Sequence, residues 1–327
     1  MIKKPLSGIR VGVSVSDSID LQRFGFLESQ LSRVLRELLN SLVYRGATII
    51  YGGNFHVDGY TIELTSRAAE YWRTHEPGEE LAFVHHAAAP LWRKLDAKSA
   101  WRHLNSLCNF GCIKIYGATE LLVEFLPESH PKSANSRGGQ SMRVSVDNVS
   151  PKISKVKGAN VIHGEAEFGS YWKALLRARP NLSVAASYST MRRGMAQEEQ
   201  ARIVLGGRVN DQDGYGSGIA DEVILGLAAD KLLLPFPAYG GCAHDAAVAL
   251  KLATPISERR NLDPAYRAQL QKISSMADGY ARKIAGLGLT SHWLEALCSA
   301  DTPASVARVC VDAIQKIAVS DSDTSRP

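Results

Sequence analysis

The chain has 327 residues, of which 45% are hydrophobic and 22% are charged, and its net charge at pH 7 is +5. This is the profile of a soluble globular protein, long enough for one large domain or two smaller ones. No apolar run could span a membrane, the lysines after Met1 are not followed by the apolar stretch of a signal peptide, and the five cysteines lack the spacing of a disulfide framework, so we expect a cytoplasmic protein with reduced thiols.

The first part of the chain alternates predicted strands and helices. The predicted strands cover residues 9–16, 47–51 and 81–86, and the helices between them cover 25–45 and 59–72. Apolar residues recur at helical spacing in the helices, and the strands are short and apolar. This order predicts right-handed crossovers between parallel strands.

The middle of the chain is harder to assign. A helical pattern over residues 90–109 precedes one further strand, which lies either around 113–115 or across 121–125, because periodicity does not decide between them. Polar and basic residues, prolines and glycines then dominate residues 127–158, which predicts an insertion or a long loop. The fold resumes with a strand over 159–163 and a helix over 181–200.

Glycines follow two aliphatic runs in the second half of the chain. Gly206 and Gly207 come directly after a predicted strand at 203–205, and Gly240 and Gly241 come shortly after another at 232–234. Gly216 and Gly218 open a helical pattern between the two strands, and further helical patterns cover 246–252, 262–287, 290–299 and 303–318, the last starting at Thr302 and Pro303.

Together these elements predict an α/β fold, with a Rossmann-like open, mainly parallel sheet and helices on both faces. We expect one domain over residues 1–255, a helical appendage over 256–319 that packs on it, and a disordered tail over 320–327.

The glycine turns predict a ligand site. In an open parallel sheet such turns lie along the carboxyl edge, where they form a groove of backbone N–H groups, hydroxyls and a few cations that suits phosphate and ribose. The expected ligand-binding residues are Ser14, Ser16, Gly52, Gly53, Asn54, His85, Met191, Arg192, Gly206, Gly207, Arg208, Gly216, Gly218, Glu222, Gly240 and Gly241. No metal site and no required cofactor are predicted.

Several of these residues have a structural alternative. The arginines, Arg193 included, could pair with phosphate or lie on the surface. Glu222, on the first turn of its helix, could favour the helix dipole, bind ribose hydroxyls or stabilise a cationic C1′ centre during glycosidic cleavage. His85, His86 and His244 are either structural or ligand contacts. A P-loop and a G-x-G-x-x-G turn after the first strand are both missing, which argues against a P-loop ATPase and an ordinary NAD dehydrogenase.

Seven segments carry a resemblance to a known superfamily. They are VSVSDSIDLQRFG (13–25), GATIIYGGNFHVDGYT (46–61), LAFVHHAAAPLW (81–92), STMRRGM (189–195), ARIVLGGR (201–208), GYGSGIADEVILGL (214–227) and AYGGCAHDAA (238–247). In this order they resemble the SLOG superfamily, which includes the DNA-processing protein DprA and the Lonely Guy phosphoribohydrolases. The resemblance is closest to the branch found beside sirtuin and TIR domains in prokaryotic immune systems.

The resemblance implies a Rossmann-like fold that binds nucleotide-derived ligands. In that branch the domain is similar to sensors of ADP-ribose-type and cyclic ADP-ribose-type signals that TIR enzymes make from NAD. It implies a homo-oligomer as well, with a separate effector or a TIR-type signal-producing protein as partner. We expect no membrane partner, and nucleic acid is the least favoured partner.

Two other functions remain as alternatives. Lonely Guy enzymes cleave N-glycosidic bonds with the motif P-G-G-x-G-T-x-x-E, and Gly216, Gly218 and Glu222 keep the spacing of two glycines and the glutamate, although Ile219 replaces the threonine. The chain would then be a nucleotide N-glycoside hydrolase with Glu222 as its key carboxylate. The third hypothesis is DprA-like nucleic-acid binding by residues 128–160, where six basic residues outnumber two acidic ones but no aromatic residues are interleaved for base stacking.

Overall fold

The computed structural model describes residues 4–18, 20–53, 59–74, 81–107, 109–127, 141–145, 161–178, 183–209, 216–255 and 262–324. The chain divides into two compact units. Unit 1 combines the two ends of the chain, Met1–Ile49 and Ala196–Pro327, and unit 2 is the stretch between them, Ile50–Met195. The C-terminal helices, which were expected to pack as an appendage after residue 255, belong to the same unit as the N-terminal strand and helix.

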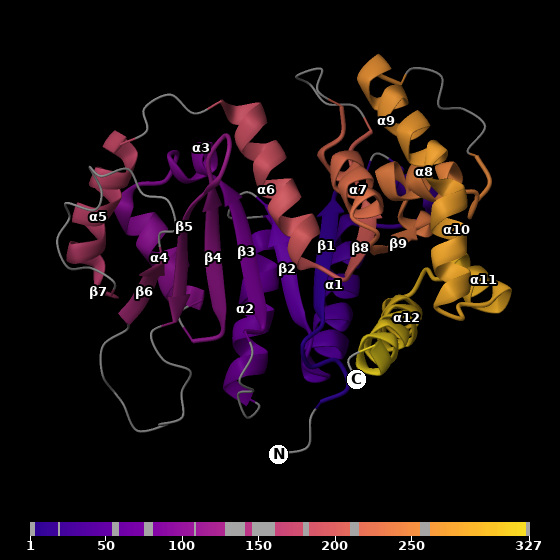
Figure 1. Cartoon of the computed structure of the whole chain (residues 1–327), viewed down its shortest axis with the longest axis horizontal. Coiled ribbons are helices and arrows are strands. Elements are labelled where there is room, and N and C mark those ends of the chain that lie inside the picture. Colours follow the sequence, from indigo (N-terminus) through magenta and orange to yellow (C-terminus); the bar gives the residue numbers. More distant parts are fainter. Residues whose placement is uncertain are drawn as a thin grey trace. The chain divides into compact units, whose positions relative to one another are not determined.

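Unit 1 is built on three parallel strands (Figure 1). They are β1 (Arg10–Ser16), β8 (Ala201–Gly206) and β9 (Leu232–Phe236), with β8 hydrogen-bonded to both of the others. Every residue of β8 and β9 is buried, as expected for parallel strands that are covered on both faces. The register places Ser16 opposite Gly206, so the carboxyl ends of β1 and β8 lie side by side.

The helices of unit 1 complete its core. They are α1 (Glu28–Tyr44), α7 (Gly218–Ala228), α8 (Gly241–Ala249), α9 (Pro264–Ser275), α10 (Ala277–Gly286), α11 (Ser291–Ser299) and α12 (Pro303–Thr324), with short 3₁₀ turns η1 (Gln22–Phe24) and η2 (Pro237–Tyr239). Leu31, Leu35, Leu38 and Leu42 recur at helical spacing and are buried, and α1 packs along α12 (Figure 1). None of the helices in the described ranges is long and apolar enough to cross a membrane.

Unit 2 contains a mixed set of strands. Strand β3 (Phe83–Ala88) pairs in parallel with β4 (Gly111–Tyr116), and β5 (Leu121–Pro127), β6 (Ser141–Ser145) and β7 (Val161–His163) follow in antiparallel order. Both positions considered for one strand near residues 113–125 are therefore strands, joined as a hairpin. Strand β2 (Thr48–Gly52) and helix α6 (Val184–Glu198) each contain one of the two unit boundaries.

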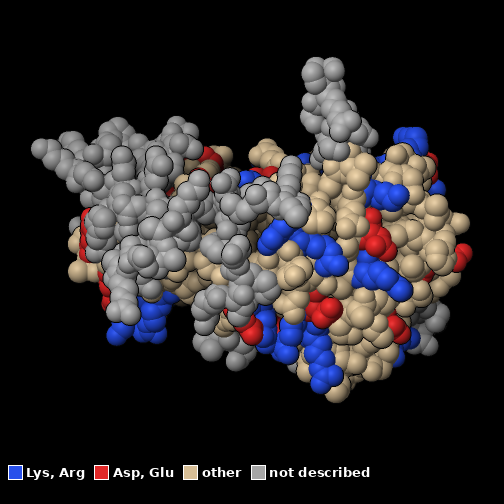
Figure 2. Space-filling view, turned by 90° about the horizontal axis from the view of Figure 1, so that it is seen from below, with Lys and Arg blue, Asp and Glu red and all other residues tan. Residues whose placement is uncertain are grey.

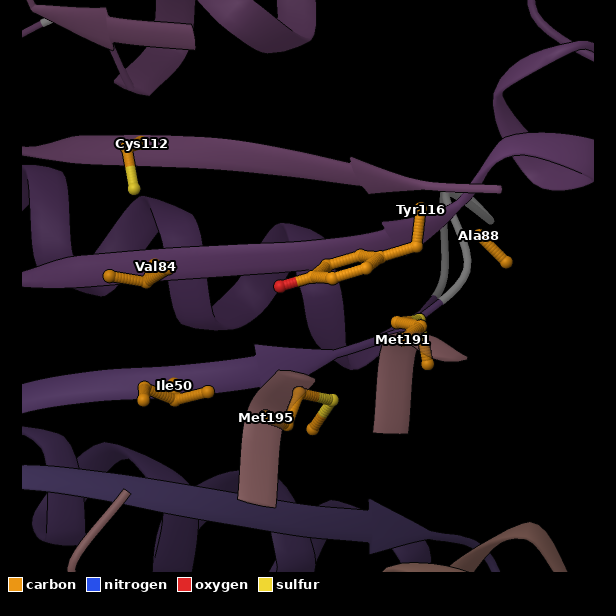
Figure 3. Close-up of a cluster of buried hydrophobic side chains, with 7 residues drawn as sticks. All are labelled: Ile50, Val84, Ala88, Cys112, Tyr116, Met191 and Met195. Carbon is orange, nitrogen blue, oxygen red and sulfur yellow. The ribbon is translucent and has the colours of Figure 1, made fainter. Parts of the chain in front are cut away.

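Helices and aromatic side chains fill the remainder of unit 2. The helices are α2 (Tyr60–Thr74), α3 (Ala89–Trp92), α4 (Ala97–Leu107) and α5 (Glu165–Ala178). A second core joins Ile50, Val84, Ala88, Cys112 and Tyr116 to Met191 and Met195, which project from α6 toward the strands (Figure 3). A separate aromatic cluster in unit 2 contains Trp92, Phe125, Phe168 and Trp172, whose rings contact one another in stacked, tilted and edge-to-face pairs.

The structure corrects several of the predicted elements. Strand β6 lies inside the segment 127–158 that was predicted as a loop, and helix α5 was not predicted, although Phe168, Tyr171 and Trp172 have helical spacing. The predicted helix over 262–287 is two helices, α9 and α10. Helix α12 continues to Thr324, so residues 320–324 of the predicted disordered tail are helical. The predicted helix over 90–109 is likewise divided, into α3 and α4. The predicted fold class is confirmed: the chain has an open α/β, Rossmann-like fold with C-terminal helices.

The start of α12 gives a direct test of how the C-terminal helices stabilise unit 1. The hydroxyl of Thr302 accepts a hydrogen bond from the N–H of Ser305 (3.2 Å), and Pro303 takes the first helical position. Replacing Thr302 with Ala should lower the free energy of unfolding by about 1 kcal/mol because that N–H loses its acceptor. Urea unfolding should show most of the loss restored in Thr302→Ser, and an unchanged midpoint for Thr302→Ala would contradict the capping role.

Candidate functional site

The end of β8 is a corner that only glycine can occupy. Gly206 and Gly207 have positive φ angles of 62° and 105°. A Cβ on Gly206 would lie 2.5 Å from the carbonyl oxygen of Ser16, and one on Gly207 would lie 2.8 Å from the Cβ of Cys242. The N–H of Gly207 donates to Ser16 (2.9 Å), and its carbonyl accepts from the N–H of Cys242 (3.1 Å). These glycines therefore bring the ends of β1 and β8 against the start of α8.

A carboxylate of the chain lies at the start of α8. Gly240 and Gly241 have φ angles of 66° and 58°, and the N–H of Gly241 donates to Oδ2 of Asp20 (2.8 Å). Asp20 is buried, with 4% of its surface exposed, and its own N–H donates to the hydroxyl of Ser18. The N-terminus of a helix attracts anions, and here the anion is Asp20, a residue that the glycine pattern did not reveal.

The start of α7 is covered by a side chain from α9. Ser217 caps the helix, and the amide of Gln269 accepts from its N–H (2.9 Å) and donates to its carbonyl (3.1 Å). The same amide donates to Asp221 (2.7 Å). A Cβ on Gly216 would lie 2.5 Å from the Gln269 oxygen, so the glycine makes room for this contact. The region expected to be a packing appendage thus supplies a polar side chain to the glycine turn.

Glu222 belongs to a buried ionic network. Its carboxylate accepts from Nη1 of Arg202 (2.7 Å) and from the hydroxyl of Ser14 (2.5 Å). Arg202 also binds both carboxylate oxygens of Glu199, from Nε at 2.7 Å and from Nη2 at 2.5 Å. Gly12 leaves the space, because a Cβ there would lie 2.0 Å from Glu199. Glu222 and Ser14, both predicted ligand-binding residues, contact Arg202 in this structure: the Glu222 carboxylate places a negative charge beside it, and the Ser14 hydroxyl accepts a hydrogen bond from it.

Burial shifts the protonation equilibria in this network. It raises the pKa of Glu199, and the charge and hydrogen bonds of Arg202 oppose that shift. Burial lowers the pKa of Arg202, but the two glutamates outweigh it and the net shift is upward. Arg202 and Glu199 have no exposed side-chain surface, so the guanidinium depends on these partners for its stabilisation.

The histidines of unit 2 have structural contacts. The ring of His85 is within hydrogen-bond distance of Nε2 of His103 (3.2 Å) and of the carbonyl of Gly53 (3.3 Å). Burial lowers the pKa of His85 to about 4 and also lowers the pKa of His103, so both rings are neutral. His86 is buried and stacks on Tyr116, with ring centroids 5.4 Å apart. His85 therefore positions the turn at Gly53 without contributing charge.

Helix α6 carries Met191 and Arg192, two of the predicted ligand-binding residues in unit 2. Met191 is part of the core shown in Figure 3, and a Cβ on Gly52 would lie 2.5 Å from the sulfur of Met195. The guanidinium of Arg192 lies 5.4 Å from the ring centroid of Tyr188. Gly52 and Met191 thus pack against the same core, and Arg192 is a half-buried cation on an aromatic face.

Other predicted residues are distributed as follows. Arg208 is exposed directly after the β8 corner, and Gly218 is the first residue of α7. His244 is buried between the carbonyls of Pro237 and Thr254, at 3.2 and 3.1 Å. Asn54 lies outside the described residues. Within unit 1, Ser16, the Gly206 corner and the starts of α7 and α8 come together. One groove formed by residues of both units stays a prediction.

Comparison with known protein families agrees with this organisation. Residues 5–137 and 172–288 match the family described as SLOG cluster2. The match includes the β8 corner, α7, α8 and α9, and it leaves out residues 138–171, where β6 and β7 lie. No curated protein and no solved structure matches the chain.

The ionic network can be tested by removing its cation. Arg202→Leu leaves Glu199 and Glu222 buried without their partner and should lower the free energy of unfolding by about 3–5 kcal/mol near pH 8. Arg10→Leu is a matched control, because Arg10 pairs with Glu198 at the surface (3.0 Å, 44% exposed), and it should cost less than about 1 kcal/mol.

The loss should also depend on pH. Without Arg202, the pKa of Glu199 rises further, and a carboxylate with a raised folded-state pKa loses its stabilising contribution as the pH rises through that value. Urea unfolding near pH 5 should therefore show a smaller loss for Arg202→Leu than unfolding near pH 8. An equal loss at both pH values would mean that packing, not charge, dominates at this position.

Proposed function

The chain belongs to the SLOG superfamily, in the family described as SLOG cluster2, and from this membership we propose that it binds a nucleotide-derived ligand of the ADP-ribose or cyclic ADP-ribose type, related to NAD. The observation that carries the proposal is the β8 corner. Gly206 and Gly207 end the middle strand of three parallel strands, the starts of α7 and α8 adjoin it, and exposed Arg208 follows it. Open α/β sheets bind their ligands at the carboxyl ends of strands.

In this proposal the phosphate is bound by charged side chains rather than by the N–H groups of the glycine turns. The N–H groups of Gly207, Ser217 and Gly241 already donate within unit 1. Phosphate is best bound by a guanidinium, which offers paired donors. Arg208 is the phosphate-binding residue of unit 1 in this proposal, and Arg192 is the corresponding residue of unit 2.

The resemblance to the sirtuin- and TIR-associated branch extends the proposal to biology. The ligand is then a signal made from NAD by a TIR-type protein in prokaryotic defence or signalling. Binding changes the self-association of this chain and acts on a separate effector. No metal or other cofactor is required for such a binding role.

N-glycosidic cleavage is the second candidate, supported by the spacing of Gly216, Gly218 and Glu222. The buried network weighs against it, since Arg202 and Ser14 both hold the Glu222 carboxylate, and a carboxylate in that position is not aimed at a sugar. Nucleic-acid binding has less support. Most of its basic segment lies outside the described residues, and Figure 2 shows acidic side chains interspersed with basic ones on one face of the described part.

Calorimetric titration with ADP-ribose, its cyclic isomers, NAD and AMP tests the binding proposal. We expect at least one of them to bind, and we expect Arg208→Ala and Arg192→Ala each to weaken binding about tenfold or more, because each removes a charge-assisted contact to phosphate. Arg308→Ala, an exposed arginine on α12, is the matched control and should bind like the wild type. No heat with any of the four ligand types would refute the proposal.

Chromatography separates binding from cleavage. After long incubation with NAD or AMP we expect no released nicotinamide or adenine, because Glu222 is held by Arg202. Release of free base that disappears in Glu222→Gln, with that variant still folded, would establish the hydrolase alternative instead.

A further inference from the structure

A second carboxylate near the β8 corner has a different environment from Glu222. Asp245 lies on α8, one turn after Gly241, and is half-buried. Its Oδ2 accepts a hydrogen bond from the hydroxyl of Tyr266 on α9 (2.9 Å), and the Tyr266 side chain is completely buried. Asp245 is therefore held in place from one side by a neutral donor and keeps part of its surface open to solvent.

A continuous set of contacts connects Asp245 to the corner. Tyr266 and Ser217, at the start of α7, are close enough to the thiol of Cys242 to influence its pKa. The N–H of Cys242 donates to the carbonyl of Gly207 (3.1 Å). The end of β8 and the starts of α7 and α8 thus meet near Cys242, and Asp245 follows on the next turn of α8, half-buried.

Two polar side chains of α9, Tyr266 and Gln269, make contacts near the corner. Tyr266 and Gln269 are three residues apart, so they lie on the same side of the helix. Gln269 holds Ser217 and Asp221, while Tyr266 holds Asp245. Helix α9 lies within the range that matches the family.

The pKa of Asp245 is raised, and shifted pKa values are common among carboxylates at functional sites. Burial raises its pKa to about 6, and the hydrogen bond from Tyr266 opposes the shift. The described titratable groups that interact with it are Tyr266 and Cys242. Burial raises the pKa of Cys242 to about 12 and that of Tyr266 above its usual range, so both stay neutral while Asp245 titrates. A carboxylate kept ionised at neutral pH against a desolvation cost is more common at binding sites than elsewhere.

From this geometry we propose that Asp245, positioned by Tyr266, is the carboxylate of unit 1 that accepts hydrogen bonds from the ribose hydroxyls of the nucleotide ligand. This inference rests on the proposed function and replaces Glu222 in the ribose-binding role. Ribose diols are good donors to a carboxylate, and Arg208 on the same corner would take the phosphate. Tyr266 is a positioning residue, because it acts through Asp245.

The test compares ADP-ribose with two analogues that each lack the 2′-hydroxyl of one of its riboses. For the wild type, calorimetry near pH 7.5 should show a preference of about tenfold for ADP-ribose over one analogue. In Asp245→Asn the affinity for ADP-ribose should fall about tenfold and the preference should largely disappear. Asp312→Asn, which removes an exposed carboxylate on α12, is the matched control and should keep both.

A pH series adds a readout that a purely structural role would not move. Wild-type affinity for ADP-ribose should fall as the pH drops from about 7.5 to about 5, because Asp245 becomes protonated, and in Asp245→Asn this dependence should be lost. Tyr266→Phe should retain a weaker preference and shift its pH dependence, since the carboxylate remains but its donor is gone.

Thermal unfolding tests the same residue without a ligand. The raised pKa means that ionised Asp245 contributes less stability as the pH rises through about 6. Asp245→Asn should therefore gain melting temperature relative to the wild type between about pH 5 and pH 8. A lower melting temperature by the same amount at every pH would mark Asp245 as a structural partner of Tyr266 and overturn the inference.

The outcomes separate this inference from the proposed function. If the wild type binds ADP-ribose and Asp245→Asn keeps its ribose preference and pH dependence, the binding function stands and the role of Asp245 is wrong. If the wild type gives no heat with ADP-ribose or with either analogue, the proposed role of Asp245 in ribose recognition is overturned. The other nucleotides of the preceding titration then decide the binding function.

Discussion

Unit 1 depends on one buried guanidinium. Arg202 lies in the middle strand of the three parallel strands, without exposed surface, and a cation in that position must be paired. Its partners come from three places: Ser14 on β1, Glu199 before β8, and Glu222 on α7. Satisfying all of them holds β1, β8 and α7 in one arrangement. That arrangement sets Ser16 opposite Gly206 and so creates the corner at which the ligand is proposed to bind.

Local patterns in the sequence revealed the glycine corner after β8 but not the ionic network around Arg202 that holds it in place. The strand ends and the glycines could be predicted because aliphatic runs and turn residues are local signals. Arg202 directly precedes the aliphatic run at 203–205 and was given no role, and Glu222 had the spacing of a catalytic motif. Their pairing joins positions far apart in the chain. No periodicity indicates which distant charge a buried side chain will meet, and for the same reason Asp20 at Gly241 and Gln269 at Ser217 were not predicted.

The fold shows the same division between local and distant information. The strands β1, β3, β8 and β9 and the start of α12 follow from patterns of a few residues. The boundary expected at residue 255 came from a proline and from the lack of strand patterns after it, whereas the packing of α12 on α1 joins the two ends of the chain in one unit. Strand β6 was hidden by the polar and basic residues around it, and it lies in the segment that the family match leaves out. Additions to a fold are harder to predict from composition than its shared core.

The backbone N–H groups at the β8 corner are already hydrogen-bonded, and this limits which groups can recognise a ligand there. Gly207, Ser217 and Gly241 use their N–H groups to join strands and helices, so the backbone anion cradle expected from the glycines is largely engaged within the fold. In the proposed function, recognition then falls to side chains, with Arg208 proposed for phosphate and Asp245 for ribose. Because Tyr266 and Gln269 come from α9, a helix after residue 255 contributes to the proposed site. Changes in α9 would alter ligand choice without any change in the glycine turns themselves.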